Sequence, residues 1–284
     1  MNRFKYYRPR SLDEVWELKE KIPGSLFIAG GTDVIVGIKN NELRPQALIS
    51  LRSIPELDDI EVDGGARIGA LATISDIIQN PELRKDYPVL VEAAKSLGSV
   101  QIRNVATIGG NLCNCSPCAD MALPLLVMEA KVRLQTTKKS REIPLNEFFK
   151  GPGESCLSPH EILTDILLDP PHKNAKTSFM KKGRVKMDLA VASVAVLLEM
   201  ESKTCRKARI AAGSVAPVPL RLLKIETMFE GATLTKKDVT EAQRLAEDNV
   251  VPITDVRSTE EYRRQITGVL VKRALERALE WKET

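Results

Sequence analysis

Two glycine pairs, each at the end of an apolar segment, constrain this chain more than any other feature of its sequence. The first ends SLFIAGGTD (residues 25–33), and the second lies in ATIGGN (residues 106–111). The first segment predicts a strand entering a tight turn, and the second predicts a turn. Glycine has no Cβ, so the backbone N–H groups of such a turn can approach an anion closely. Each pair is also compatible with an ordinary turn that binds nothing.

Taken together, the two turns could hold two sides of one extended ligand, and a dinucleotide with a pyrophosphate fits that description. Thr32 and Asp33 add a hydroxyl and a carboxylate to the first turn. Thr107 and Asn111 add a hydroxyl and an amide to the second. Neither turn is a G-x-G-x-x-G or a Walker A motif, so neither of those phosphate-binding mechanisms transfers to it. From the residues alone, a ligand site and two ordinary turns stay as alternatives.

Three cysteines follow the second turn closely, in CNCSPC (residues 113–118). Structural zinc and iron–sulfur sites usually have four protein ligands, so a fourth would have to come from elsewhere. Cys156, in GPGESCL, is the best candidate for that fourth ligand. The alternative is a set of small, buried and inert thiols.

Charged residues near these motifs are few. Asp120 directly follows the cysteines, and it either contacts a ligand or caps the next helix. The lysines of SFMKKGR (residues 178–184) either approach a ligand or lie on a solvated face. A lysine near a flavin would stabilise the reduced ring by Coulomb attraction.

Composition narrows the class of protein. The 284 residues are 43% hydrophobic and 28% charged, as in ordinary soluble proteins. No apolar run is long enough for a transmembrane helix, and the N-terminus lacks the apolar region of a secretory signal. We therefore expect a cytoplasmic protein. The net charge of +4 and the aromatic content of 4% disfavour nucleic-acid binding. The five cysteines, an odd number, argue against a disulfide framework.

The order of apolar segments predicts three units. Residues 1–52 form a small α/β unit whose first helix begins at Ser11. Residues 53–170 mix strands, Gly/Pro loops and a helix that ends at Gly98, where glycine suits a left-handed cap. A linker around LLDPPHKNAK leads to residues 174–284, which begin with two strand-rich segments and end in helices.

In this order, the segments resemble the FAD-binding subunit of the molybdenum hydroxylases, the family of xanthine dehydrogenase and aerobic carbon monoxide dehydrogenase. YYRPRSLDEV resembles the opening of the family, and AGGTDV and ATIGGNLCNCSPCAD resemble its two flavin-binding signatures. FMKKGRVKMDLA resembles a segment that contributes a lysine, and AAGSVAPVPLR resembles part of the C-terminal domain. The resemblance covers nearly the whole chain.

The resemblance implies an α+β protein: a two-subdomain FAD-binding fold of the PCMH type, followed by a C-terminal α+β domain of antiparallel sheet plus helices. FAD would lie between the subdomains with its pyrophosphate on the first turn. Carried over by motif, the first turn contributes Phe27, Ile28, Ala29, Gly30, Gly31, Thr32, Asp33 and Val34. The second signature contributes Gly98, Ala106, Thr107, Gly110, Asn111, Cys113 and Asn114. Asp120 and Leu163 would lie near the flavin ring. Lys181 is the expected family lysine, with Lys182 as the alternative because this segment is one residue shorter than the usual pattern.

The resemblance also implies a hetero-oligomeric oxidoreductase, a heterotrimer in which this subunit transfers electrons. A small subunit would carry two [2Fe–2S] clusters, and a large subunit would hold the molybdenum cofactor and the substrate. The FAD subunit would pass the electrons to NAD⁺ or another acceptor, so it needs no catalytic residue for the substrate. A stand-alone FAD-dependent oxidase and a non-enzymatic iron–sulfur or zinc scaffold are the alternatives.

The cysteines are where the sequence departs from this family. Positions 115 and 118 are usually small or apolar in the motif, and some reductase relatives carry an extra [4Fe–4S] cluster on a longer loop that is absent here. The family places the GPGESCL loop close to the flavin. Two hypotheses therefore stay open: a [4Fe–4S] cluster on Cys113, Cys115, Cys118 and Cys156, or thiols without a metal.

Overall fold

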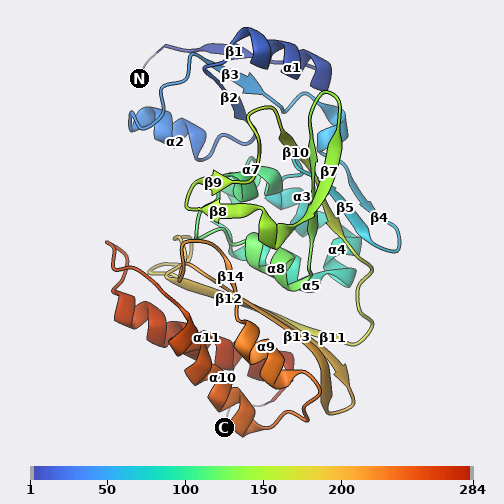
Figure 1. Cartoon of the computed structure of the whole chain (residues 1–284), viewed down its shortest axis with the longest axis vertical. Coiled ribbons are helices and arrows are strands. Elements are labelled where there is room, and N and C mark those ends of the chain that lie inside the picture. The colour runs from blue at the N-terminus through green and yellow to red at the C-terminus, as the bar shows by residue number, and fades with distance from the viewer. Residues whose placement is uncertain (1–2, 282–284) are drawn as a thin grey trace.

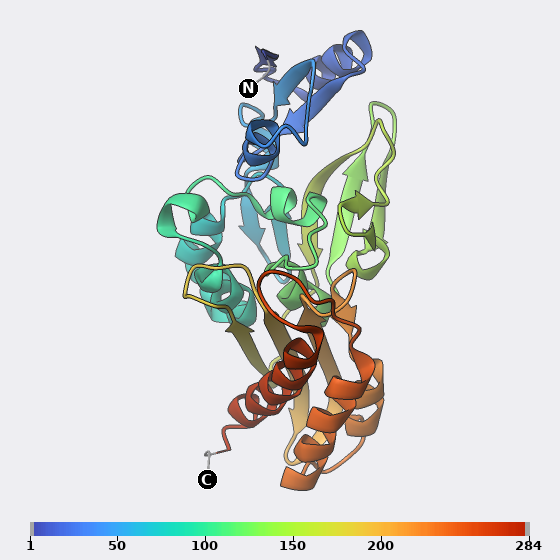
Figure 2. The same cartoon turned by 90° about the vertical axis from the view of Figure 1, so that its left-hand side faces the viewer.

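The computed structural model describes residues 3–281, and its three units follow one another along the long axis of the molecule. The N-terminal unit lies at one end and the C-terminal unit at the other, as Figures 1 and 2 show from two directions. The middle unit contacts both, so any site it shares with a neighbour lies at one of these two junctions.

The N-terminal unit is a parallel sheet with two helices. Its elements are β1 (Lys5–Tyr7), α1 (Leu12–Lys21), β2 (Ser25–Ile28), α2 (Val34–Lys39) and β3 (Ala47–Ser50). The strand order is β1-β3-β2, and both pairs are parallel. Ser11 caps α1 as predicted, because its hydroxyl accepts a hydrogen bond from the Glu14 N–H at 3.3 Å. Val15 and Trp16 bury the inner face of α1 in one core cluster with Ile49.

The middle unit is built on a five-stranded antiparallel sheet. Its elements are η1 (Pro55–Leu57), β4 (Ile60–Val62), β5 (Ala66–Gly69), α3 (Ile74–Gln79), α4 (Pro81–Asp86), α5 (Pro88–Ser96), α6 (Val100–Arg103), α7 (Ile108–Cys113), α8 (Ala122–Val127), β6 (Lys131–Gln135), β7 (Ser140–Pro144), η2 (Leu145–Glu147), β8 (Phe149–Gly151), β9 (Glu154–Ser155) and β10 (Ile162–Leu168). The sheet order is β4-β5-β10-β6-β7. Helix α5 ends just before Gly98, whose φ of +47° is left-handed, as the sequence predicted.

The C-terminal unit is a four-stranded antiparallel sheet with its helices on one face, and the middle unit packs on the other face. Its elements are β11 (Ala175–Lys182), β12 (Ala192–Glu201), β13 (Thr204–Gly213), β14 (Leu220–Arg221), α9 (Leu223–Phe229), α10 (Lys236–Asn249) and α11 (Glu260–Ala278). In β12, Val194 and Val196 pack in one core with the C-terminal helices, whereas Ala195 and Leu197 pack in the core of the middle unit. Successive side chains of a strand point to opposite faces, so a strand buried on both faces needs the continuous apolar run of this segment.

Ion pairs and hydrogen bonds join the middle and C-terminal units on two sides. Glu92 of α5 accepts a hydrogen bond from the Phe179 N–H at 2.9 Å and also pairs with Arg277 of α11. On the other side, Glu129 accepts a hydrogen bond from Arg209 of β13 at 2.8 Å. These contacts hold β11 and β13 against α5 and the end of α8.

The predicted α+β class and the C-terminal antiparallel sheet with helices are confirmed. The predicted unit limits, residues 1–52, 53–170 and 174–284, stay a prediction. Within residues 3–281, no helix is long and apolar enough to cross a membrane.

Candidate functional site

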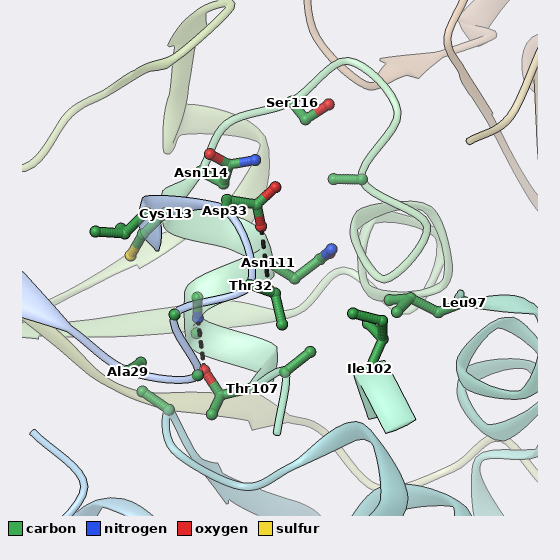
Figure 3. Close-up of a pocket in the computed structure, with 18 of the residues that line it drawn as sticks. Ala29, Thr32, Asp33, Leu97, Ile102, Thr107, Asn111, Cys113, Asn114 and Ser116 are labelled. Carbon is green, nitrogen blue, oxygen red and sulfur yellow. Dashed lines mark hydrogen bonds between the residues drawn. The ribbon is translucent and has the colours of Figure 1, made fainter. Parts of the chain in front are cut away.

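A cavity of about 600 Å³ lies where segments of the three units meet (Figure 3). This volume is in the range of cofactor and small-molecule sites. Its walls come from the turn after β2, the α6–α7 region, the cysteine segment, the start of β10 and the end of β11. Figure 3 shows Thr32 and Asp33 on one side, Leu97 and Ile102 on the other, and Asn111 between them.

The first glycine pair forms the turn between β2 and α2. Gly31 has a φ of +77°, a conformation that side chains rarely adopt. A Cβ on Gly30 would lie 2.1 Å from the Val105 carbonyl oxygen, so the turn touches the backbone that leads into the second glycine pair. The two turns therefore meet directly and form one cradle in the cavity wall.

The second glycine pair lies in the first turn of helix α7, so the prediction of a turn at ATIGGN is wrong. Thr107 caps α7, because its hydroxyl oxygen accepts a hydrogen bond from the Gly110 N–H at 3.0 Å. A Cβ on Gly109 would lie 2.6 Å from both the carbonyl oxygen and the Cβ of Ala70. The glycine here allows α7 to approach the end of β5 closely, and it places Asn111 in the cavity.

The Thr107 cap leads to a prediction. Replacing Thr107 with alanine should lower the free energy of unfolding by about 1 kcal/mol, the usual cost of losing a helix cap. It should also weaken FAD binding, because α7 carries Asn111 into the cavity. Thr107→Ser keeps the hydroxyl and should behave like the native protein in urea unfolding and FAD titration. Equal losses in the two variants would contradict this role.

Two buried acceptor atoms in the cavity wall lack partners. Asn111 Oδ1 and Asp120 Oδ1 are both buried, and neither finds a hydrogen-bond partner among the described residues. Buried polar atoms are nearly always hydrogen-bonded, so these two oxygens indicate a ligand or water that donates. FAD offers such donors in its ribityl hydroxyls and ring N–H, whereas the first glycine turn can offer N–H groups to its pyrophosphate. The residues present therefore fit FAD.

Asp120 pairs with Lys181 at one end of the cavity. Lys181 Nζ lies 2.5 Å from Asp120 Oδ2 and donates a second hydrogen bond to the Ser96 carbonyl at 3.2 Å. Burial raises the pKa of Asp120, and the Lys181 ammonium opposes that rise. Asp120 does not cap α8, whose N-cap is Met121 and has no side-chain bond, so that alternative is wrong. Lys181 lines the cavity, whereas Lys182 is exposed and lies outside its lining.

The four cysteines of the predicted cluster do not form one group: Cys113, Cys115 and Cys156 interact with one another, whereas Cys118 turns away from them. Cys115 is 1% exposed and belongs to the central core, where its thiol lies 3.3 Å from the Leu112 carbonyl. Burial raises the pKa of Cys115 to about 11, as expected for an inert thiol. Cys118 faces the C-terminal unit, with its sulfur 3.6 Å from Arg257 Nη1.

Across residues 3–281, no group of three or more histidine, cysteine or acidic side chains could hold a metal ion. The predicted [4Fe–4S] ligands Cys113, Cys115, Cys118 and Cys156 are thus not among such groups, and that they bind a cluster stays a prediction. Cys113, at the end of α7, instead lines the cavity.

The residues predicted to bind the flavin lie together around the cavity. All of the predicted flavin residues line the cavity except Ile28, which packs with Ile38 and Leu48 on the opposite face of β2. That they contact FAD stays a prediction. Sequence reasoning missed several lining residues, among them Leu97, Ile102, Ser116, Glu161, Met187, Asp188 and Leu189. Ser116 lies inside the second flavin signature and residues 187–189 lie inside FMKKGRVKMDLA, so both could have been found from segments already recognised.

Glu161 holds the loop that precedes β10. It accepts hydrogen bonds from Arg141 Nε at 2.7 Å and from the Ser158 N–H at 2.9 Å. Arg141 lowers the pKa of Glu161 to about 2, despite the burial of this carboxylate. The loop also carries Leu157, which lines the cavity with Glu161.

This lowered pKa predicts a pH dependence of stability. The folded value of about 2 lies below the ordinary value of 4.5, so the contribution is present above pH 4.5 and is lost as the pH falls toward 2. Glu161→Gln should therefore lose less thermal stability than the native protein between pH 4.5 and pH 2. Glu154→Gln, at an exposed carboxylate of β9, is the matched control and should follow the native curve. Parallel melting curves for native protein and Glu161→Gln would refute the assignment.

Comparison with known proteins matches two segments of the chain, residues 2–170 and 177–278, to domains of molybdenum hydroxylase flavoproteins. Residues 2–170 match the FAD binding domain in molybdopterin dehydrogenase, and residues 177–278 match the CO dehydrogenase flavoprotein C-terminal domain. A putative xanthine dehydrogenase FAD-binding subunit of Escherichia coli is 30% identical, over 96% of this chain and 95% of the relative. The carbon monoxide dehydrogenase medium chain of Hydrogenophaga pseudoflava is 31% identical over 97% of each.

Solved structures share this fold over nearly the whole chain. A carbon monoxide dehydrogenase structure from Hydrogenophaga pseudoflava superposes with a TM-score of 0.95 over 99% of both chains, at 30% identity. A quinoline 2-oxidoreductase from Pseudomonas putida, at 24% identity and a TM-score of 0.93, shares the fold.

Proposed function

The chain belongs to the FAD-binding medium subunits of the molybdenum hydroxylase family, which are oxidoreductase subunits, and we propose that it carries electrons from an iron–sulfur partner to an acceptor. The donor is a small subunit with [2Fe–2S] clusters, and a large subunit holds the molybdenum cofactor and the substrate. The acceptor is NAD⁺ or another oxidant. The names of the relatives, "medium chain" and "FAD-binding subunit", support a hetero-oligomer of this kind.

The observation that carries this proposal is the cavity where the two glycine turns meet. The turn at Gly30 and Gly31 would offer backbone N–H groups to the pyrophosphate, and the second glycine pair lets the backbone at α7 pack closely beside it. Asn111 would accept a hydrogen bond from the ribityl chain through its unpartnered oxygen. Asp120, Lys181 and Leu163 also line the cavity and would hold the ring.

The protein supplies binding, orientation and electrostatics, and bound FAD supplies the redox chemistry, since it exchanges electrons singly or in pairs. Lys181 holds Asp120 in place, and Ile102 and Leu97 line one side of the cavity with apolar surface. Proton transfer to the substrate is assigned to the partner subunit, because this proposal places the substrate there.

The test is purification of the tagged chain from its host under anaerobic conditions. We expect a flavin absorbance spectrum and co-purification of two further subunits, one with molybdenum and one with [2Fe–2S] iron. Flavin without any partner would favour a stand-alone oxidase, and a chain without flavin would favour a scaffold. Adding NAD⁺ to the chemically reduced complex then tests the acceptor, because reoxidation of the flavin identifies NAD⁺ as competent.

A further inference from the structure

We infer that Asp120 and Lys181 act on the flavin ring as one electrically neutral pair, in which Asp120 presents a hydrogen-bond acceptor and Lys181 is its positioning residue. This inference rests on the proposed function, because it takes FAD to occupy the cavity. It differs from the expectation drawn from the sequence, in which a lysine acts on the ring as a lone positive charge. The two descriptions predict different reduction potentials for the same variants.

The surroundings of the Lys181 ammonium support a neutral pair. Its nitrogen lies 2.5 Å from Asp120 Oδ2 and 3.2 Å from the Ser96 carbonyl at the C-terminal end of α5. The Lys181 and Asp120 side chains are only 8% and 5% exposed, so water screens this contact little. A helix C-terminus carries partial negative charge. The positive charge of Lys181 is therefore balanced by groups already in contact with it.

The free group in this pair belongs to Asp120. Its Oδ2 is used by Lys181, whereas its Oδ1 is buried without a partner among the described residues. Asp120 lines the cavity, so a ligand can supply the missing donor. The flavin ring has such a donor in its N3–H, which keeps its proton in the oxidised and in the reduced ring. The site thus presents a carboxylate oxygen to the ring, and Lys181 keeps that carboxylate charged and in position.

The remaining carboxylates of the cavity lining do not disturb this balance. Glu161 is paired with Arg141 at 2.7 Å, and Asp188 with Arg184 at 2.6 Å. Asp33 is exposed in the first glycine turn, where water screens it. A charge pair acts on its surroundings as a dipole, whose field falls off faster than that of a single charge. Removal of Asp120 therefore creates a full positive charge near the ring, removal of Lys181 creates a negative one at a pH where Asp120 is ionised, and removal of both restores neutrality.

The test is a dye-equilibrated redox titration of the flavin in the holo complex, with Lys181→Met, Asp120→Asn and the double variant. Without the ammonium, the buried Asp120 takes up a proton more readily, so Lys181→Met is titrated at alkaline pH. Where Asp120 is ionised, this variant leaves a negative charge that disfavours the anionic reduced ring, so its potential should fall. Asp120→Asn leaves a positive charge, so its potential should rise. We expect each single change to alter the ratio of affinities for reduced and oxidised FAD at least tenfold, which is about 30 mV for two electrons. The double variant should stay within threefold of the native ratio.

A lone lysine charge predicts a different pattern. If Lys181 acted alone, the double variant would have the lowered potential of Lys181→Met, and that result would overturn the inference. Unchanged potentials in all three flavin-loaded variants would overturn it as well. Lys182→Met, at the exposed neighbour on β11, is the matched control and should keep the native potential.

Two further outcomes distinguish failure of this inference from failure of the proposed function and from misfolding of a variant. A native complex that lacks a flavin spectrum would refute the proposed function, and the inference would fall with it. If a single variant does not fold because it buries an unpaired charge, the double variant still decides. The double variant replaces the pair with side chains of similar shape and no charge. A native potential in it supports the neutral pair, and a lowered potential supports a lone lysine charge.

Discussion

Replacing Gly30 with alanine is expected to lower the affinity for FAD at least 100-fold, which corresponds to about 2.7 kcal/mol. The added Cβ would lie 2.1 Å from the Val105 carbonyl oxygen and 2.9 Å from the Ala106 Cα. Both contacts are with backbone, so no side chain can rotate away to relieve them. The first glycine turn would have to move away from the second, and the cradle proposed to hold the pyrophosphate would open.

Fluorescence titration with FAD and thermal unfolding measure the two effects of Gly30→Ala. Overpacking of this kind should also cost about 1–3 kcal/mol in the free energy of unfolding. Gly151→Ala is the matched control, because the nearest atom to its Cβ would be Glu154 Oε2 at an ordinary 3.4 Å. A Gly30→Ala protein that binds FAD as tightly as the control would show that the two turns do not form the binding site together.

The β-rich C-terminal segment shows what the sequence could predict. The run that became β12 is apolar without alternation, which predicts a strand buried on both faces or a buried helix segment. Its β-branched residues favour a strand, and the structure has one between two cores. Ser11 and Gly98 were predicted correctly for a similar reason, since a cap depends on residues close to it in the chain.

The second glycine pair shows where local reasoning fails. Glycine is unfavourable inside a helix, so ATIGGN predicted a turn. The structure has a helix there despite the two glycines. Position 109 is glycine because α7 lies too close to Ala70 for any side chain. Contact with a segment nearly 40 residues away therefore overrides local propensity.

The cysteines and the buried pair depend on contacts that sequence spacing does not contain. The spacing of Cys113, Cys115 and Cys118 resembles a metal site, but spacing does not fix the direction of a side chain. Cys115 has a φ of +46° and turns into the core, and Cys118 meets Arg257 from the distant C-terminal unit. The contact of Asp120 with Lys181, 61 positions later, is equally invisible before folding. The family resemblance placed both near the flavin, but it did not show that they neutralise each other.

Arg263 is the second position where a single change should have a large effect. It lies on α11 and is 2% exposed. Its Nη1 donates to the carbonyl oxygens of Val191 at 2.7 Å and Ser214 at 3.1 Å, and its Nη2 lies 2.7 Å from Asp255 Oδ1. Val191 ends the loop that carries Met187 and Leu189 into the cavity lining. One guanidinium thus fixes three segments around one wall of the site.

Arg263→Met should therefore lower the free energy of unfolding by about 3–5 kcal/mol, because it leaves Asp255 and two carbonyl oxygens without this buried donor. For a chain of this size the melting temperature should fall by about 10 °C. Arg273→Met, on the exposed side of the same helix, is the control and should change it little. Denaturant unfolding of the two variants, with FAD content measured in parallel, separates loss of stability from loss of the site. If Arg263→Met and Arg273→Met unfold at the same denaturant concentration, the guanidinium does not hold the loop. The stability of this wall would then come from the apolar packing of α11 on β12.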